Sequence, residues 1–376
     1  MRSLFPAITK ILLLGFLLVP FITTISCAER IVPSDRVRSS LNVREFPQVG
    51  SAVVGGLFPQ QSAEFLESVP YWYRVRLDDG TSGYVSKAWA ELVAQAQESD
   101  GLVRIGSWNI KKLGHGNQKD YATVAKIIES NFDVMAVIEV MQKGGTCPGY
   151  EPLLAALGPA WKGLVTDNPR PNTTSGNAEY YAILYRSALV RTCPGWDKLA
   201  FHLDNDGNGQ NSGVDVFARE PAFGCFEVPN NNSTVGFDFL LAGYHARWEN
   251  GNKEMIMAEV RNLKEVFQTM GDSRPGEADL LIAGDFNLIP SEIQEALHFV
   301  PETIASGSTL NSSGSITQNV YDHILVHSKV ATQEMIDHPT VIDVTSLSHD
   351  GHEFYTRVSD HLPVMARFRT FGPDDD

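Results

Sequence analysis

Short runs of alternating apolar and polar residues fill the segment from residue 36 to residue 94. Residues 41–44, 53–55 and 72–76 are rich in β-branched and aromatic side chains, and Asp-Gly and Ser-Gly turns follow within residues 79–83. A period of two between tight turns is typical of antiparallel strands with one buried face. The pattern predicts a small all-β domain, a β-barrel, over residues 36–94.

The pattern changes at residue 102 to longer apolar runs and helical spacing. Residues 103–108 and 134–138 are apolar enough for buried strands, and residues 121–130 and 254–270 carry apolar side chains three and four positions apart, as helices do. Further strands are predicted at 181–185, 221–228, 239–244, 280–283, 322–326 and 364–368. The mixture predicts an α/β sandwich over residues 102–370. The polar residues 95–101 predict a linker, and residues 305–319 a surface loop.

The N-terminus has the organisation of an export signal. A short basic region precedes residues 11–22, which are almost wholly apolar, and small or hydroxylated residues follow up to Cys27. Such a run is too short to span a bilayer comfortably and predicts a signal peptide over residues 1–27. Residues 25–27 also resemble the lipobox of bacterial lipoproteins, with Thr24 where that motif usually has Leu. We expect an exported protein, either secreted or held at the bacterial cell envelope by a lipid on Cys27.

Composition and charge narrow the classes of partner. The 376 residues are 43% apolar and 20% charged, as in soluble globular proteins, with a formal charge of −15. A basic footprint, the usual mark of a protein that sits on a polyanion, is therefore missing. An acidic balance suits either solubility or the collection of divalent cations. Beyond Cys27, the three cysteines Cys147, Cys193 and Cys225 lack zinc-site spacing, and outside the cytosol they predict one disulfide and one spare thiol, with the pairing left open.

Carboxylate, amide and imidazole side chains stand repeatedly at the ends of the strands predicted within residues 102–370. Any one of them could merely cap a turn, but a rigid sheet can present the ordered set to a single cleft. The set is Asn109, Glu139, Asp285, Asn287, Asp322, Asp360 and His361. Phosphodiester hydrolysis needs an activated water, a stabilised anionic transition state and a protonated leaving oxygen. Mg²⁺ takes a few carboxylate or amide oxygens, and a histidine oriented by a carboxylate is a base near neutral pH.

The ordered blocks that carry these residues resemble the endonuclease/exonuclease/phosphatase superfamily. They are SWNI (107–110), IEV (138–140), GDFN (284–287), YDH (321–323) and SDH (359–361). Two more, EYYAILYR (179–186) and REP (219–221), resemble its DNase I branch. The resemblance covers residues 102–370 and implies a two-sheet α/β sandwich with its active site at one rim. Similarly, the order LNVR…WYRVRLDDGTSGYVS resembles a bacterial SH3 (SH3b) domain across residues 36–94. It implies a targeting module for cell-wall or peptide ligands, and a structural spacer is the alternative.

The DNase I-like resemblance implies two histidine–carboxylate pairs. His361, oriented by Asp322, would be the base toward water, and His245, paired with Glu179, would assist the leaving group or orient the phosphate. Mg²⁺, with Mn²⁺ as a substitute, would be the cofactor. The remaining roles implied are Glu139, Asn109 and Asp360 for the metal, Asp285 for the water, and Asn287, Lys111 and Arg219 for phosphate. His323 is expected only as a neighbour of the site.

Residues 204–215 contain a second candidate ion site. Oxygen-bearing side chains stand at the calcium-loop positions, among them Asp204, Asp206, Asn208 and Asp215, with glycine at the sixth position. The twelfth position holds Asp rather than the usual Glu. The DNase I branch also carries structural Ca²⁺ in this region. Two interpretations of these residues therefore stand side by side: a structural Ca²⁺ site, or a solvated Asn/Gly-rich loop.

The grip on DNA departs from the DNase I pattern at two positions. The branch inserts an Arg and a Tyr into the minor groove, and Met141 and Asn177 stand at the matching places. Neither side chain supplies that charge or wedge. We expect a monomeric Mg²⁺-dependent phosphodiesterase with DNA as the favoured substrate, touching a membrane only through a lipid anchor. The alternatives are a phosphodiesterase or phosphatase for lipid head groups or nucleotides, and a noncatalytic envelope adaptor that acts through the SH3b domain.

Overall fold

A computed structural model of the chain provides the structure. It describes residues 29–34, 36–59, 61–77, 79–94, 101–116, 118–171, 178–204, 216–229, 235–248, 251–298, 307–327, 334–347 and 350–370. The signal peptide expected at residues 1–27 with Cys27, most of the expected linker, and Asn177 lie outside these ranges. So do Asp206, Asn208 and Asp215 of the expected calcium loop. Among the described helices, none has both the length and the apolar character needed to cross a membrane.

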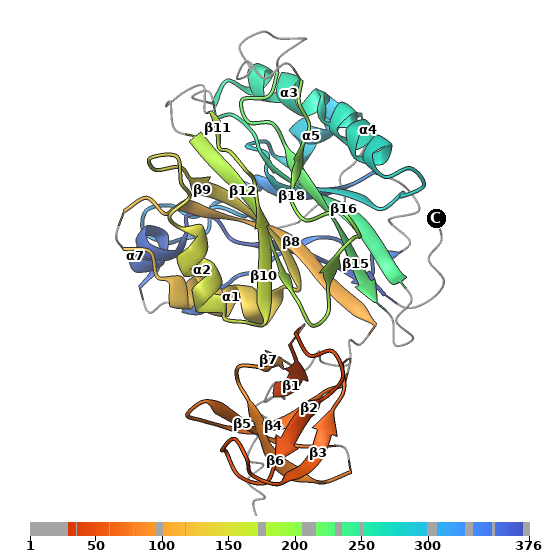
Figure 1. Ribbon diagram of the computed structural model, residues 1–376. Coiled ribbons are helices and arrows are strands. Elements are labelled where there is room, and N and C mark those ends of the chain that lie inside the picture. The colour runs from red at the N-terminus through yellow and green to blue at the C-terminus, as the bar shows by residue number, and fades with distance from the viewer. Residues whose placement is uncertain are drawn as a thin grey trace, which may run out of the picture.

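The first seven strands form one antiparallel sheet, drawn in red and orange in Figure 1. The strands are β1 (Glu29–Pro33), β2 (Leu41–Arg44), β3 (Val53–Leu57), β4 (Ala63–Val69), β5 (Trp72–Arg76), β6 (Ser82–Ser86) and β7 (Ala90–Ala94), in the spatial order β3-β2-β6-β5-β4-β1-β7. Alternate side chains enter a small core, as the period of two predicts: Val43, Val75 and Val85 are fully buried. The all-β domain is confirmed. Its described pairings leave the outer strands β3 and β7 unjoined, so the sheet is open where a closed barrel was expected.

The remaining strands form two sheets, which confirms the expected α/β sandwich. One sheet has the order β10-β12-β9-β8-β20-β19, with β11 on β12, and the other has β13-β15-β16-β17-β18, with β14 on β15. The strands of the first are β8 (Leu102–Leu113), β9 (Val134–Met141), β10 (Trp161–Val165), β11 (Arg170–Pro171), β12 (Ala178–Arg186), β19 (Thr340–Val341) and β20 (Val364–Arg369). Those of the second are β13 (Arg191–Thr192), β14 (Ala200–Phe201), β15 (Ala222–Pro229), β16 (Val235–His245), β17 (Leu280–Asp285) and β18 (Asp322–Val326).

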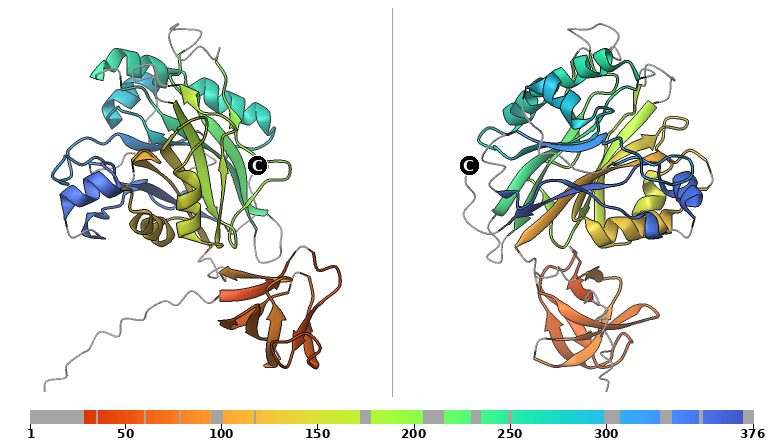
Figure 2. Two further views of the ribbon diagram at one scale, coloured as in Figure 1. Left: turned by 60° about the vertical axis from the view of Figure 1, so that its left-hand side comes forward. Right: turned by 180° about the vertical axis from the view of Figure 1, so that it is seen from behind.

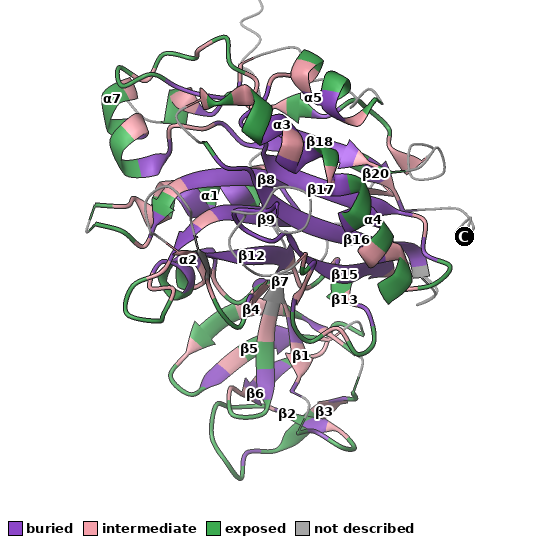
Figure 3. Ribbon diagram, turned by 90° about the horizontal axis from the view of Figure 1, so that it is seen from above, coloured by how far each residue is buried: buried purple, intermediate pink, exposed green. Residues whose placement is uncertain are grey.

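Helices cover the outer faces of the two sheets (Figure 2). The first sheet packs on α1 (Tyr121–Asn131) and α2 (Tyr150–Leu157), and the second on α3 (Lys253–Arg261), α4 (Leu263–Ser273) and α5 (Pro290–Leu297). Short turns η2 (Thr345–Leu347), α7 (Gly351–Glu353) and η3 (Phe354–Val358) precede β20. Between the sheets lies an apolar core that includes Ile138, Tyr181 and Phe239. In Figure 3 the strands accordingly carry the colour of buried residues, while the helices turn exposed faces outward.

Two local features differ from the sequence-based expectations. The helix expected over residues 254–270 is divided into α3 and α4, because the Asn262 N–H bonds the carbonyl of Glu259, only three residues back. Within the expected surface loop 305–319, Ser308 and Thr309 are buried, and Thr309 forms a bridge with His361.

The described cysteines match the expected count of one disulfide and one free thiol. Cys193 and Cys225 form the disulfide, and Cys147 is free.

Strand direction decides where the polar strand ends meet. β8 runs parallel to β9, and β16 runs parallel to β17. The carboxyl ends of each parallel pair therefore lie at one edge, and their polar end residues converge there. Gly284 permits the close approach of β16 and β17, since a Cβ at this position would lie 1.8 Å from the carbonyl oxygen of Tyr244.

Candidate active site

Asp285 lies at the centre of the converging strand ends. In the sheet register it stands opposite both His245 on β16 and Asp322 on β18. Its Oδ2 atom lies 3.7 Å from Nε2 of His245 and 3.6 Å from Nε2 of His361. Both imidazoles therefore point their Nε2 atoms at one carboxylate.

His361 is held in a fixed orientation by Asp322. Its Nδ1 lies 2.8 Å from Oδ2 of Asp322, and the hydroxyl of Ser308 donates to the same oxygen over 2.7 Å. Burial of the ring acts to lower the pKa of His361. The negative charges of Asp322 and Asp285 outweigh burial and hold this pKa well above its usual value. The pair has the geometry of a histidine base whose tautomer is set by a carboxylate.

Glu179 holds His245 in the same way from the other sheet. Its Oε2 lies 2.8 Å from Nδ1 of His245, and its Oε1 lies 3.0 Å from Nε of Arg219. Burial acts to raise the pKa of Glu179, but Arg219 and His245 outweigh it and lower this pKa to about 2. Burial and Arg219 act to lower the pKa of His245, and the Glu179 carboxylate outweighs them, so the pKa is raised. This imidazole thus favours its protonated form.

Arg219 occupies a different environment from the one expected of a phosphate contact. Its side chain is only 4% exposed, and Nη1 donates to the carbonyl oxygens of His245 and Ala246 over 3.0 and 3.2 Å. Together with the ion pair to Glu179, these bonds fix the guanidinium behind the His245 pair. Asn287 is also anchored here: its Nδ2 donates to Ala246, and its N–H donates to Oδ1 of Asp285.

The expected metal ligands lie at the ends of β8 and β9. The Nδ2 group of Asn109 donates to Oε1 of Glu139 and to Oδ2 of Asp285, each over 3.0 Å. Oε2 of Glu139 accepts the N–H of Lys112 over 2.7 Å. Oδ2 of Asp360 lies 3.2 Å from Nζ of Lys111.

The oxygen donors of the site fit a divalent cation. Ligand atoms of Asp285, Asp322 and His361 all lie within 4.8 Å of one another. Among the described residues, Oδ1 of Asp322 is buried and has no hydrogen-bond partner, so it retains an oxygen lone pair for a ligand. Carboxylate and amide oxygens are the donors that Mg²⁺ prefers. This cluster shares no residue with the expected set of Asn109, Glu139 and Asp360, but Nδ2 of Asn109 donates to Oδ2 of Asp285 and so joins the two groups.

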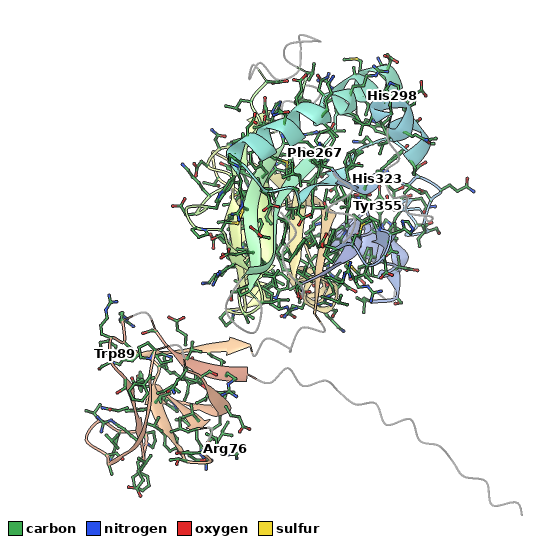
Figure 4. All side chains as sticks on the ribbon, turned by 90° about the vertical axis from the view of Figure 1, so that its right-hand side faces the viewer. Arg76, Trp89, Phe267, His298, His323 and Tyr355 are labelled. Carbon is green, nitrogen blue, oxygen red and sulfur yellow. A yellow bond between two sulfur atoms is a disulfide. The ribbon has the colours of Figure 1, made fainter. Side chains whose placement is uncertain are left out.

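Three further residues bear on the site, and sequence patterns did not single out their roles. Nζ of Lys119 donates to the carbonyl oxygens of Ile110, Lys111 and Val358 over 3.0, 2.9 and 2.8 Å, and burial lowers the pKa of Lys119 to about 8. Ser308 comes from the expected surface loop. Tyr355, labelled in Figure 4, has its ring centroid 3.3 Å from Nζ of Lys111. No sequence motif or spacing indicates that these side chains lie near the active site, because only the tertiary fold brings them there.

His323 and Met141 are buried rather than presented to a substrate. Nε2 of His323 lies 2.9 Å from the carbonyl oxygens of Leu288 and Val320, and burial lowers the pKa of His323 to about 4. Met141 is 2% exposed and faces Glu179 in the strand register. Of the expected calcium ligands, only Asp204 is described. Its Oδ2 accepts the N–H groups of Val216 and Phe217, which closes the loop at its base.

Comparisons with known proteins agree with this architecture. Residues 39–91 match the family model of the bacterial SH3 domain. The chain is 30% identical over 275 residues to a deoxyribonuclease of Thioalkalivibrio sp. (strain K90mix), and the match covers 71% of each sequence. The chain therefore belongs to the same family as this deoxyribonuclease, and it contains a bacterial SH3 domain at residues 39–91.

Solved structures of low sequence identity also match the chain. One is an endonuclease/exonuclease/phosphatase family protein from Bacteroides thetaiotaomicron, with 16% identity, a TM-score of 0.48, and coverage of 72% of this chain and 98% of that one. Another is the mannosyl-6-phosphatase Bt3783 of Bacteroides thetaiotaomicron VPI-5482, with 18% identity, a TM-score of 0.49, and coverage of 70% and 98%.

Proposed function

We propose that this protein is an exported, Mg²⁺-dependent endonuclease that hydrolyses DNA phosphodiester bonds. The observation that carries the proposal is the meeting of two carboxylate-backed imidazoles at Asp285, with Nε2 distances of 3.7 and 3.6 Å. A deoxyribonuclease among the relatives supports the choice of DNA. A noncatalytic adaptor would have no need of two such pairs on one carboxylate.

The proton transfers follow from the two histidine pairs. In its neutral form, His361 takes a proton from water through Nε2 while Asp322 holds its Nδ1–H. The water oxygen bonds to phosphorus, the bond from phosphorus to the leaving oxygen breaks, and protonated His245 gives its proton to that oxygen. Asp285, between the two rings, positions the attacking water, and Asn287 and Lys111 are placed to contact the phosphate. We assign Arg219 to positioning Glu179, in place of a direct phosphate contact.

Asn109, Glu139 and Asp360 would hold the cation, with Asp285 and Asp322 close by. A bound Mg²⁺, or Mn²⁺ in its place, would supply positive charge to the phosphoryl oxygens and would offset the carboxylate charges around His361. The residues themselves keep the ligand oxygens in place: Asn109 and the Lys112 N–H fix both carboxylate oxygens of Glu139.

The test compares plasmid cleavage by the wild type with that by His361→Ala, in Mg²⁺ and in EDTA. Loss of a general base is expected to lower the rate by about 10²–10⁴-fold, and EDTA to abolish cleavage. His298→Asn is a matched control. His298 lies at the exposed end of α5, labelled in Figure 4, with a left-handed backbone that Asn tolerates. Cleavage that survives both His361→Ala and EDTA would refute the mechanism.

The acidic charge favours a second candidate, a phosphodiesterase or phosphatase for lipid head groups or nucleotides. Parallel assays on bis(p-nitrophenyl) phosphate, phospholipid and plasmid separate the two. Hydrolysis of the first or second substrate without plasmid cleavage would favour this candidate over the endonuclease.

Export, the lipid on Cys27 and a structural Ca²⁺ at residues 204–215 complete the proposal and rest on the sequence. Labelled palmitate incorporated by wild type and lost in Cys27→Ala tests the anchor. A thermal melting curve that does not move at millimolar Ca²⁺ would remove the calcium site from the proposal.

A further inference from the structure

The N-terminal domain contains a cavity of about 410 Å³ that the proposed catalysis does not use. Its walls come from the chain before β2, from β2 and the turn that follows it, from the start of β5, and from the end of β6 with the turn before β7. The charged and aromatic residues that line it are Arg36, Arg38, Arg44, Trp72 and Trp89. Among the described lining residues there is no acidic side chain.

Within the described ranges, the arginines at this cavity are not paired with carboxylates. In the described part of the chain, Arg36, Arg38 and Arg44 form no ion pair with a carboxylate; Arg36 bonds the carbonyl of Ala88, and Arg44 that of Ser51. Elsewhere on the same sheet arginines are neutralised. Arg74 pairs with Glu67 over 3.2 Å, and Arg76 pairs with Glu64 over 2.9 Å. Among the described residues, Arg36, Arg38 and Arg44 thus bring positive charge without a carboxylate partner to the cavity.

Aromatic surface accompanies this charge. Trp89, labelled in Figure 4, is 47% exposed, and the guanidinium of Arg36 lies 5.3 Å from its ring centroid. Val49, also on the cavity wall, is 87% exposed. An arginine stacked on a tryptophan is a platform on which a planar ring can stack.

The two domains differ in their net charge. Residues 101–370 hold 21 lysines and arginines against 32 aspartates and glutamates, whereas residues 29–94 hold seven against eight. The catalytic domain thus repels a polyanion, and the N-terminal domain offers a cationic, aromatic cavity of about one nucleotide's size.

We propose that this cavity binds a single-stranded segment of nucleic acid, with phosphates on Arg36, Arg38 and Arg44 and a base stacked against Trp89. The choice of nucleic acid rests on the proposed endonuclease function, and the inference adds a second contact that keeps the substrate near an acidic catalytic domain. Salt-sensitive, sequence-tolerant binding follows from phosphate contacts combined with stacking.

The test measures binding of a fluorescein-labelled dT12 oligonucleotide by the full chain in EDTA, using fluorescence anisotropy. Arg36→Ala/Arg38→Ala is expected to lower the affinity at least about tenfold and to reduce the salt slope by about one to two. Arg74→Ala/Arg76→Ala is the matched control, because it removes the same charge from arginines paired with glutamates, and it should change the affinity less than twofold. Thermal melting confirms that both variants fold.

Several outcomes would overturn the inference. Unchanged affinity in Arg36→Ala/Arg38→Ala removes the cavity as the site, and equal losses in both double variants reduce the effect to overall charge. Binding of a carboxylate-bearing cell-wall peptide, with no binding of dT12, replaces nucleic acid by a peptide ligand. Plasmid cleavage distinguishes a failure of this inference from a failure of the proposed endonuclease function. Cleavage without arginine-dependent binding of dT12 would support the endonuclease function and refute nucleic-acid binding in the cavity. Arginine-dependent binding without cleavage would support the cavity site and refute the endonuclease function.

Discussion

At the scale of single residues, the site consists of buried charges that compensate one another. Glu179 receives Arg219 on one oxygen and His245 on the other, and all three side chains are less than a tenth exposed. A buried ion pair has little net effect while both partners are present, but removal of one leaves a charge without compensation. Arg219 is therefore as necessary to the geometry of His245 as Glu179 is.

Glu179→Gln is predicted to change how stability depends on pH. The pKa of Glu179 is lowered to about 2, so this carboxylate stabilises the fold above its usual pKa near 4.5, and the contribution disappears as the pH falls toward 2. Urea unfolding at pH 7, 4.5 and 3 measures the effect. We expect the variant to lose about 3 kcal/mol at pH 7, where Arg219 remains unpaired, and less at pH 3. An equal deficit at all three pH values would contradict the assignment. Glu353→Gln, at an exposed pair with Arg357, is the control.

Glu139→Gln is predicted to raise the Mg²⁺ concentration needed for cleavage. The amide keeps a side-chain oxygen but removes the negative charge that attracts the cation, so the half-maximal Mg²⁺ concentration should rise at least about tenfold, with partial recovery at high Mg²⁺. Cleavage rates across a Mg²⁺ titration provide the measurement. Glu151→Gln, at an exposed position in the first turn of α2, should leave the curve unchanged. A loss of rate with no shift of the midpoint would argue against Glu139 as a ligand.

At the scale of elements, the sequence was informative about strand ends and uninformative about the segments that join them. Apolar runs ending in Asn109, Glu139 and Asp285 predict strands because burial and periodicity are local properties. The contact of Ser308 with Asp322 is set by the way residues 307–321 fold back on the sheet, and no local pattern records it. The division of α3 from α4 is equally invisible, because apolar spacing continues across Asn262.

Lys119 connects two of these elements, and its substitution is predicted to impair catalysis. Its ammonium bonds the end of β8, where Lys111 and Lys112 have positive φ angles of 32° and 51°, to Val358 at the end of η3. Lys119→Met leaves three carbonyls without this donor and loosens the segments that carry Asn109 and Asp360. We expect a fall in kcat/KM of at least about tenfold, since misplacement by about 1 Å can cost a hundredfold.

A Mg²⁺ titration distinguishes this positioning role from a loss of folding. The midpoint should shift upward in Lys119→Met even where thermal melting shows the protein fully folded. Lys126→Met, at an exposed position on α1, is the matched control and should behave as the wild type. An unshifted midpoint in folded Lys119→Met would contradict the positioning role.

At the scale of the whole molecule, the sequence predicted the fold class, but it did not predict that the N-terminal sheet is open or which cysteines form the disulfide. Two domains, an α/β sandwich and an all-β sheet follow from the change of period at residue 102. The pairing of Cys193 with Cys225 did not follow, because three cysteines allow several disulfides and only the packing of Cys193 beside β15 selects one.

Loss of the disulfide is predicted to lower stability. It closes a loop of 32 residues in the second sheet, and a loop of this length corresponds to about 4 kcal/mol in the unfolded chain. Cys193→Ser/Cys225→Ser should therefore melt several degrees below the wild type, whereas Cys147→Ser should not. Equal melting temperatures for both variants would mean that the bond has no such effect in solution.

The active site can be completed only late in synthesis, because β8 is joined by residues from the end of the chain. β8 carries Asn109, but its partner β20 and the adjoining Asp360 and His361 come about 250 residues later in the chain. At a synthesis rate of about 5–20 residues per second, that interval lasts roughly 13 to 50 s. Throughout it the growing chain holds one part of the proposed site without its base, so, under the proposed function, a half-finished chain cannot yet cleave DNA.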